Sequence, residues 1–104
     1  MRILPDPIAF MWDKGNIEKN FKSHKVSNKE AEEVFENSPH FLLDDKKHST
    51  ETEKRYMLWG ETDYNRKLTV IFTIRENKVR VISARDMHTK ERRRYEELKT
   101  NSSI

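Results

Sequence analysis

The chain has 104 residues, of which 38% are charged and 34% hydrophobic, and it carries a net charge of +3 without a single cysteine. This length suits one domain with a modest core, and the missing thiols exclude disulfide bonds and thiolate metal sites. Because no apolar run approaches the roughly 20 residues of a membrane span, and the N-terminus lacks a signal-peptide core, we expect one soluble, cytoplasmic domain over residues 1–104.

Residues 1–9 are expected to form an N-terminal extension, and a first helix follows them. Asp13 is suited to cap this helix. Ile17, Phe21 and His24 come next at intervals of four and three residues, a spacing that places side chains on one face of a helix. The spacing therefore predicts an amphipathic helix whose apolar face includes Ile17 and Phe21.

The second helix has the clearest signal in the chain. Ser27 and Glu30 fit the S-x-x-E capping box, in which each side chain bonds the backbone N–H of the other residue. An apolar stripe follows within residues 31–35. The Asn-Ser-Pro sequence at residues 37–39 then predicts the end of the helix.

Four strands are predicted from the second half of the chain, where β-branched and aromatic residues gather between polar turns. The third run is nearly continuous in apolar character at residues 68–72, which indicates a strand in the middle of the sheet. Short turns at residues 63–66 and 76–78 favour hairpins on either side of it. The four expected strands span residues 40–45, 55–62, 67–75 and 78–85.

The last helix is expected over residues 88–99, with Thr89 or a neighbour as its cap. Tyr95 and Leu98 should supply its apolar contacts, and residues 100–104 should fray. The order is then two helices, four strands joined mainly by tight turns, and one helix. Helices segregated from an antiparallel sheet make an α+β domain.

Charge is distributed unevenly along the chain. Residues 27–63 sum to −5, whereas residues 64–94 hold ten Lys and Arg against three acidic residues and sum to +7. A basic half of this density can bind phosphates and attract a polyanion. The alternative is that the acidic and basic stretches neutralise each other in the folded domain.

Several kinds of chemistry are excluded by the motifs that the chain lacks. It has only two glycines and neither a glycine-rich phosphate loop nor a nucleophile elbow. Its four histidines form no ligand pair at helical spacing, so we expect no metal site and no cofactor. What remains is many arginines and lysines with scattered histidines and carboxylates.

These residue types suit metal-free cleavage of RNA. The 2′-hydroxyl of the RNA is the nucleophile, so the protein need not supply one. One protein group takes its proton, another protonates the leaving 5′-oxygen, and a cation stabilises the charge on the phosphorane. Arginine suits the last role because its guanidinium binds phosphate oxygens in pairs.

A set of short motifs follows in a fixed order from residue 10 to residue 97. They are W-D at Trp12, N-F-K-S-H-K-V-S from Asn20, the A-x-x-V-F helix, D-K-K-H-S from Asp45, R-Y-M-L-W-G from Arg55 and, most specific, R-V-I-S-A-R-D-M-H-T-K-E-R-R-R-Y-E from Arg80. In these motifs the sequence resembles the BrnT family of type II toxins.

The resemblance implies a RelE-type fold and a toxin that cleaves RNA and stops translation. It also implies a BrnA-type antitoxin with a ribbon-helix-helix domain as the partner, and contact with DNA only through that antitoxin. The family usually has K-H-G-V where this chain has residues 23–26. Because glycine suits a left-handed helix end and Lys25 does not, we expect the first helix to end differently here.

Chemistry and resemblance together give the candidate site residues. Arg85 ends the last strand and matches the family's I-S-x-R, and Arg66 opens the central strand; both are expected to stabilise the transition state. The candidates for proton transfer are Asp45, His24 and His48. The candidates for RNA binding are Arg55, Lys90, Arg93 and Arg94.

Other uses of these residues stay open. Arg85 can instead pair with a carboxylate such as that of Asp44, Asp45 or Asp86. Each residue turns about 100° around a helix, so residues 92–94 cannot all face one ligand, and some should pair with Glu91, Glu96 or Glu97. The rival function is a non-catalytic basic module that binds an acidic protein partner or nucleic acid.

Overall fold

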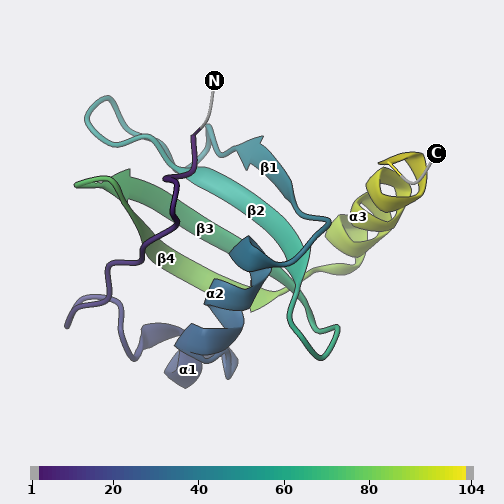
Figure 1. The fold of residues 1–104 in the computed structure, drawn as a ribbon, viewed down its shortest axis with the longest axis horizontal. Coiled ribbons are helices and arrows are strands. Elements are labelled where there is room, and N and C mark those ends of the chain that lie inside the picture. The colour runs from purple at the N-terminus through teal and green to yellow at the C-terminus, as the bar shows by residue number, and fades with distance from the viewer. Residues whose placement is uncertain (1–2, 103–104) are drawn as a thin grey trace.

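The computed structural model describes residues 3–102 and has the α+β architecture predicted from the sequence (Figure 1). The strands lie in the order β1-β2-β3-β4, and all neighbours are antiparallel. Each predicted strand is present within one residue of its expected bounds. The elements are α1 (Lys19–His24), α2 (Asn28–Glu36), β1 (Phe41–Asp44), β2 (Tyr56–Glu61), β3 (Lys67–Arg75), β4 (Lys78–Asp86) and α3 (Thr89–Ser102).

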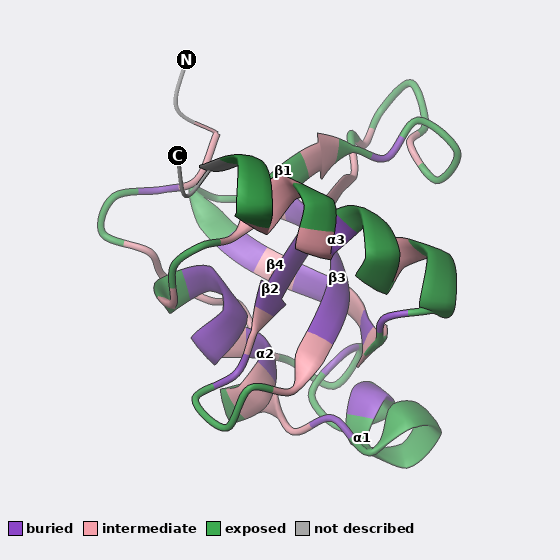
Figure 2. Ribbon diagram, turned by 90° about the vertical axis from the view of Figure 1, so that its right-hand side faces the viewer, coloured by how far each residue is buried: buried purple, intermediate pink, exposed green. Residues whose placement is uncertain are grey.

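The sheet separates two apolar clusters. On one face Leu58, Val70 and Ala84 lie in register on neighbouring strands and pack with α2. Because successive side chains in a strand alternate, Trp59 projects from the opposite face, where it packs with Tyr95 of α3. Figure 2 shows α3 in front of this second face, with much of its outer surface exposed. The sheet is therefore sandwiched between α2 and α3.

The central strand and its hairpin follow the prediction. Residues 68–72 of β3 are each at most 9% exposed, so this stretch is covered on both faces. A two-residue turn of Glu76 and Asn77 joins β3 to β4, and both residues have positive φ angles, of 53° and 59°. Positive φ at both central positions is what a tight hairpin turn of this length requires.

The capping box of α2 is confirmed. The Ser27 hydroxyl accepts from the Glu30 backbone N–H at 3.1 Å, and the Glu30 carboxylate accepts from the Ser27 backbone N–H at 2.9 Å. The helix then lies very close to β2 at Gly60, where a Cβ atom would come within 2.8 Å of Val34 Cγ1. This close approach fixes α2 on the sheet.

The prediction for the first helix was wrong in its start and in its buried face. A turn at residues 14–18 precedes α1, whose N-cap is Glu18; the Asp13 carboxylate accepts from Gly15 within that turn instead. Ile17 and Phe21 are 46% and 56% exposed, whereas Asn20 is only 2% exposed. The polar side of α1 thus faces the sheet.

The physical reason lies at the free edge of β4. Val79 forms two backbone hydrogen bonds with the N-terminal segment, each 2.8 Å long. Farther along the strand, Asn16 donates to the Val81 carbonyl at 3.0 Å, and Asn20 accepts from the Ala84 backbone N–H at 2.9 Å. These asparagines occupy the place of a fifth strand and satisfy edge groups that would otherwise be buried unpaired. The inward positions are therefore polar.

The end of α1 also differs from the prediction. Lys25 adopts the left-handed conformation, with φ 56° and ψ 35°, at the C-cap. Its backbone N–H bonds the Phe21 carbonyl at 3.0 Å, and the next N–H reaches the Asn20 carbonyl at 3.3 Å. The helix therefore keeps the left-handed end that glycine favours, although a lysine occupies the position.

The last helix is longer than predicted. Its apolar contacts are as expected, since Tyr95 is fully buried and Leu98 packs in the same cluster. Residues 100–102 are helical rather than frayed, and residues 103–104 lie outside the described part of the chain. None of the helices within residues 3–102 is long and apolar enough to cross a membrane.

Candidate functional site

A bulge in β4 brings two arginines to one face of the sheet. Arg80 pairs with Thr73 and Arg85 with Thr69, and the register shifts between these two pairs. Because the arginines are five residues apart, regular alternation would place them on opposite faces. The bulge inserts one residue and so re-aims the strand. Both arginines consequently project from the face that α3 partly covers.

Two further arginines share this face by the same alternation. Arg75 follows Thr73 by two residues in β3. Arg55 precedes Tyr56, which packs in the cluster on the α2 side, so Arg55 itself points the other way. Glu53 bridges this pair, with 3.0 Å to Arg55 and 2.7 Å to Arg75. We call the side of the sheet that bears Arg55, Arg75, Arg80 and Arg85 the arginine face.

Arg85 is held by a carboxylate of α3. Its two terminal nitrogens donate to the two Glu91 oxygens at 2.7 and 3.0 Å, and the first of them also donates to the Asp86 carbonyl at 3.2 Å. Glu91 accepts in addition from the Thr69 hydroxyl and from the His88 backbone N–H. Burial alone would raise the pKa of Glu91, but these donors outweigh it and lower that pKa. Arg85 is thus a preorganised cation whose present partner is an anion.

A histidine–aspartate pair lies in the loop after β1. His48 Nδ1 is 2.7 Å from Asp45 Oδ2, and Asp45 is only 7% exposed. The His48 side chain is half exposed. Ser49 and Arg55 bind the same loop, since the Ser49 hydroxyl donates to the Asp45 carbonyl and accepts from the Arg55 backbone N–H. The bond at Nδ1 orients the imidazole and leaves Nε2 for proton exchange.

Arg66 joins three elements of the fold. It donates to Asp86 at 2.7 and 3.1 Å, to Glu30 at 3.1 Å, and to the carbonyls of Lys25 and His24 at 2.8 and 3.2 Å. A guanidinium has five N–H donors, and these bonds engage all of them. The bond to Asp86, and then that to Glu30, raises the pKa of Arg66. Binding a phosphate here would require the exchange of an existing bond.

The cations of α3 are solvent-exposed. Lys90, Arg92, Arg93 and Arg94 all lie on its outer surface. Arg94 is 3.6 Å from Glu97, one of the pairings expected from the sequence. Lys90 and Arg93 form no ion pair within residues 3–102, so they are available to an external anion.

The predicted site residues fall into two groups at opposite ends of β2. Asp45, His48 and Arg55 lie where the strand begins. Arg66 bonds Thr62 just beyond its end, and the other candidates at this end are His24, Arg85 and Lys90, with Arg93 and Arg94 farther along α3. Six residues of strand separate the groups, about 20 Å at 3.4 Å per residue. The structure therefore brings each group together but not the two groups with each other.

Arg75 and Arg80 of the arginine face, and Glu91 of α3, were missed as site candidates. Glu91 was considered only as a partner for residues 92–94, yet it binds Arg85. The sequence signal for Glu91 was its position three residues after His88, where a carboxylate can accept a hydrogen bond from the backbone N–H of the residue that caps the helix. Arg80 was missed because only the bulge puts it on the same face as Arg85. It pairs with Asp13, and this bond lowers the pKa of Asp13.

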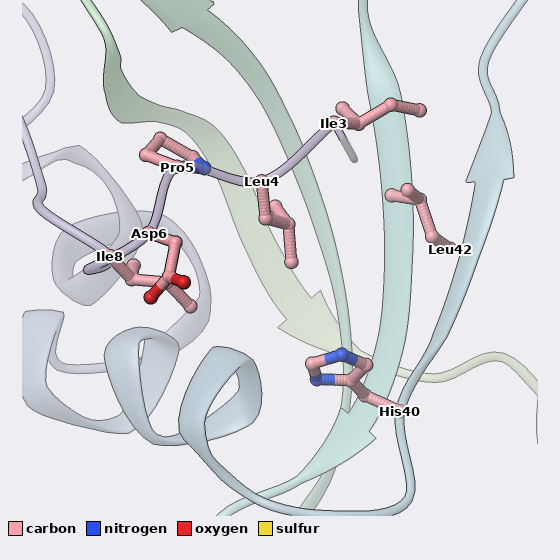
Figure 3. A pocket seen from close by; sticks show the side chains of 7 residues that line it. All are labelled: Ile3, Leu4, Pro5, Asp6, Ile8, His40 and Leu42. Carbon is pink, nitrogen blue, oxygen red and sulfur yellow. The ribbon is translucent and has the colours of Figure 1, made fainter. Parts of the chain in front are cut away.

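Elsewhere on the surface lies a hollow that could hold a ligand. Figure 3 shows a hollow between the N-terminal segment and β1, where Leu4, Ile8 and Leu42 are gathered with His40. None of the predicted site residues lines it. Across residues 3–102, no three His, Asp or Glu side chains are grouped so that they could hold a metal ion.

Comparison with known proteins gave one family match. Residues 12–91 match the family described as "Ribonuclease toxin, BrnT, of type II toxin-antitoxin system". The match covers α1, α2, the whole sheet and the start of α3 as far as Glu91. No curated protein matches the chain significantly.

Proposed function

Because the chain belongs to the BrnT family of ribonuclease toxins of type II toxin–antitoxin systems, we propose that it is an endoribonuclease that cleaves RNA without a metal ion. Cleavage of RNA in this way stops translation. A BrnA-type antitoxin neutralises the toxin, and the toxin reaches DNA only through that antitoxin. The relation to the RelE fold stays a prediction from the resemblance.

The observation that carries the proposal is the Asp45–His48 pair beside Arg55. A ribonuclease of this kind needs a group that exchanges a proton with RNA and a cation that stabilises the phosphorane. His48 is oriented by a buried carboxylate, and its side chain is half exposed. Arg55 donates through Nε to Glu53, which leaves its terminal nitrogens for a phosphate.

The reaction then proceeds in one displacement. A base removes the proton of the 2′-hydroxyl, the 2′-oxygen attacks phosphorus, and the bond to the 5′-oxygen breaks as an acid protonates that oxygen. His48 serves as one of these two proton carriers. Arg85, preorganised by Glu91 on the same face, binds the phosphate backbone farther along the RNA.

The remaining cations extend the path of the RNA. Lys90, Arg93 and Arg94 bind phosphates beyond Arg85, because they are exposed on α3, the helix that follows Arg85 in the chain. His24 lies at the Arg66 end, about 20 Å from His48, so we do not assign it as the second proton carrier of this displacement. Arg66, with all its donors engaged, supports that end of the face by holding α1, α2 and β4 together.

The test is incubation of purified protein, free of antitoxin, with labelled total RNA in excess EDTA. We expect wild-type protein to generate new RNA ends, and His48→Gln to slow cleavage about 100-fold or more, as loss of a general acid or base does. Arg55→Ala and Arg85→Ala should also slow it. His88→Gln is the matched control, because His88 is exposed and its side chain forms no hydrogen bond within residues 3–102.

Two results would contradict the proposal. Cleavage that disappears in EDTA and returns with magnesium would refute the metal-free mechanism. Intact RNA combined with salt-sensitive RNA binding would instead support the rival, a non-catalytic basic module. A cell-free translation assay with the same variants separates RNA cleavage from inhibition of translation.

A further inference from the structure

The segment containing α1 exposes its apolar side chains and buries its polar ones. Ile17 and Phe21 are 46% and 56% exposed, although Asn16 and Asn20 beside them are each only 2% exposed. The asparagines are explained by the edge of β4, to which both are bonded. Nothing in the folding of the domain requires large apolar groups on the outside. Large apolar side chains that are exposed against the usual pattern of burial mark interaction surfaces.

The exposed pair is surrounded by lysines. Lys14, Lys22 and Lys25 are all exposed within the same stretch, where the exposed carboxylates are those of Glu18 and of Asp13, the latter paired with Arg80. Lys22 lies 3.4 Å from Glu18, and Lys25 Nζ lies 5.6 Å from the centre of the Phe21 ring. The surface therefore has an apolar centre with a positively charged rim.

We propose that this surface, made by Ile17, Phe21 and the three lysines, is a docking site for an acidic amphipathic segment of the antitoxin. Two apolar side chains about one helical turn apart fit the apolar stripe of such a segment. The lysines face its carboxylates at the rim, where charges guide association and set specificity. The inference rests on the family's antitoxin being the partner, but not on the catalytic residues proposed above.

RNA is a less suitable occupant of this surface. The arginine face, where we place RNA, carries guanidiniums that bind phosphate in pairs, whereas residues 14–25 contain lysines and no arginine. Ile17 offers no flat ring on which a base can stack. Asn16 in the preceding turn and Asn20 in α1 bond the backbone of Val81 and Ala84, two residues whose side chains belong to the cluster on the α2 side.

The first test measures affinity for the purified antitoxin encoded with this toxin. We expect Ile17→Ser/Phe21→Ser to weaken binding tenfold or more, because central apolar contacts dominate interfaces. Its RNA cleavage should match the wild type and its thermal midpoint should fall only slightly, since both side chains are about half exposed. Tyr64→Ser is the control: Tyr64 is 93% exposed and lies in the turn between β2 and β3. An unchanged affinity of the double variant would overturn the proposal.

The second test uses charge and leaves the apolar pair intact. Lys14→Glu/Lys22→Glu should weaken antitoxin binding at low salt, and the deficit should shrink as added salt screens the exposed charges. An equal affinity of this variant and the wild type at low salt would refute the acidic partner. If instead the apolar variant loses RNA binding and keeps the antitoxin, the surface belongs to RNA and the proposal fails.

The two proposals fail in distinguishable ways. Wild-type protein that leaves RNA intact would refute the ribonuclease mechanism, yet the affinities for the antitoxin could still be compared among the variants. Conversely, full RNA cleavage by Ile17→Ser/Phe21→Ser with unaltered antitoxin affinity would refute only the docking site.

Discussion

The side-chain oxygen of Asn20 accepts a hydrogen bond from the backbone N–H of Ala84, 2.9 Å away and out of contact with solvent. This bond joins α1 to the outer edge of β4. With the neighbouring bond from Asn16 to Val81, it covers part of a strand edge that the N-terminal segment does not reach. The orientation of α1, and with it the exposure of Ile17 and Phe21, depends on this arrangement.

Replacing Asn20 should destabilise the domain. Asn20→Ala leaves the Ala84 N–H buried without a partner, which we expect to lower the free energy of unfolding by about 1–3 kcal/mol. Urea denaturation measures the difference, with Ser23→Ala, an exposed residue of the same helix, as the control. If Asn20→Ala unfolds at the wild-type urea concentration, the side chain does not close the edge of β4 in solution.

Glycine at position 25 should stabilise the domain. Lys25 has a φ of 56°, a conformation that glycine adopts without strain. Lys25→Gly should therefore raise the unfolding free energy by about 0.5–1 kcal/mol. Lys22→Gly is the matched control, because it places glycine inside the same helix and should be destabilising by a similar amount. An equal decrease in the free energy of unfolding in both variants would argue against a left-handed conformation at the end of α1.

Arg66 should be needed for stability. Arg66→Lys keeps the charge but has only three donors for the two carboxylates and two carbonyls that Arg66 now binds. Because Asp86 is 57% exposed and water screens its pairing, we expect a loss of only about 1 kcal/mol. Arg92→Lys, at an exposed position on α3, is the control in the same urea series. A wild-type stability for Arg66→Lys would exclude the proposed support role.

Glu91 should make stability depend on acid pH. Burial opposes the charged form, but the bonds from Arg85 and the His88 N–H lower the pKa of Glu91 below its ordinary value of 4.5. A lowered pKa in the folded state contributes stability above the unfolded pKa, and this contribution is lost as pH falls through the folded pKa. Glu91→Gln should thus cost about 1–2 kcal/mol at pH 7.

The difference between Glu91→Gln and the wild type should begin to shrink as the pH falls below the ordinary glutamate pKa of 4.5, and it should disappear as the pH falls through the lowered pKa of the folded state. Thermal unfolding at a series of pH values measures this convergence. Glu97→Gln, an exposed residue of the same helix, serves as the reference. Parallel stability curves at all pH values would show that the Arg85–Glu91 pair does not stabilise the fold.

Part of the candidate site could be predicted from the sequence. Asp45 and His48 were both predicted, and their separation of three residues within one loop favours the contact that the structure shows. Arg85 was predicted to face an anion, but its partner is Glu91 rather than any of the three aspartates considered. Glu91 lies in α3, the element that follows β4, and whether its side chain reaches Arg85 depends on how α3 packs on the sheet.

The sequence by itself determined the elements and the family. The Ser27–Glu30 capping box, the hairpin at Glu76 and Asn77, and the apolar run of β3 all depend on residues a few positions apart, and such local interactions are encoded in local patterns. The motif order from residue 10 to residue 97 agreed with the family match over residues 12–91.

Only the tertiary structure decided which way α1 faces and which cations gather. Asn16 and Asn20 turn inward because β4 is an edge strand, and the need of its backbone for partners arises only once the strand order is set. Arg80 and Arg85 share a face because of one bulge, which an alternating pattern does not reveal. The orientation of α1 and the shared face of the two arginines both depend on the backbone hydrogen bonding of β4, whose partners lie far away in the sequence.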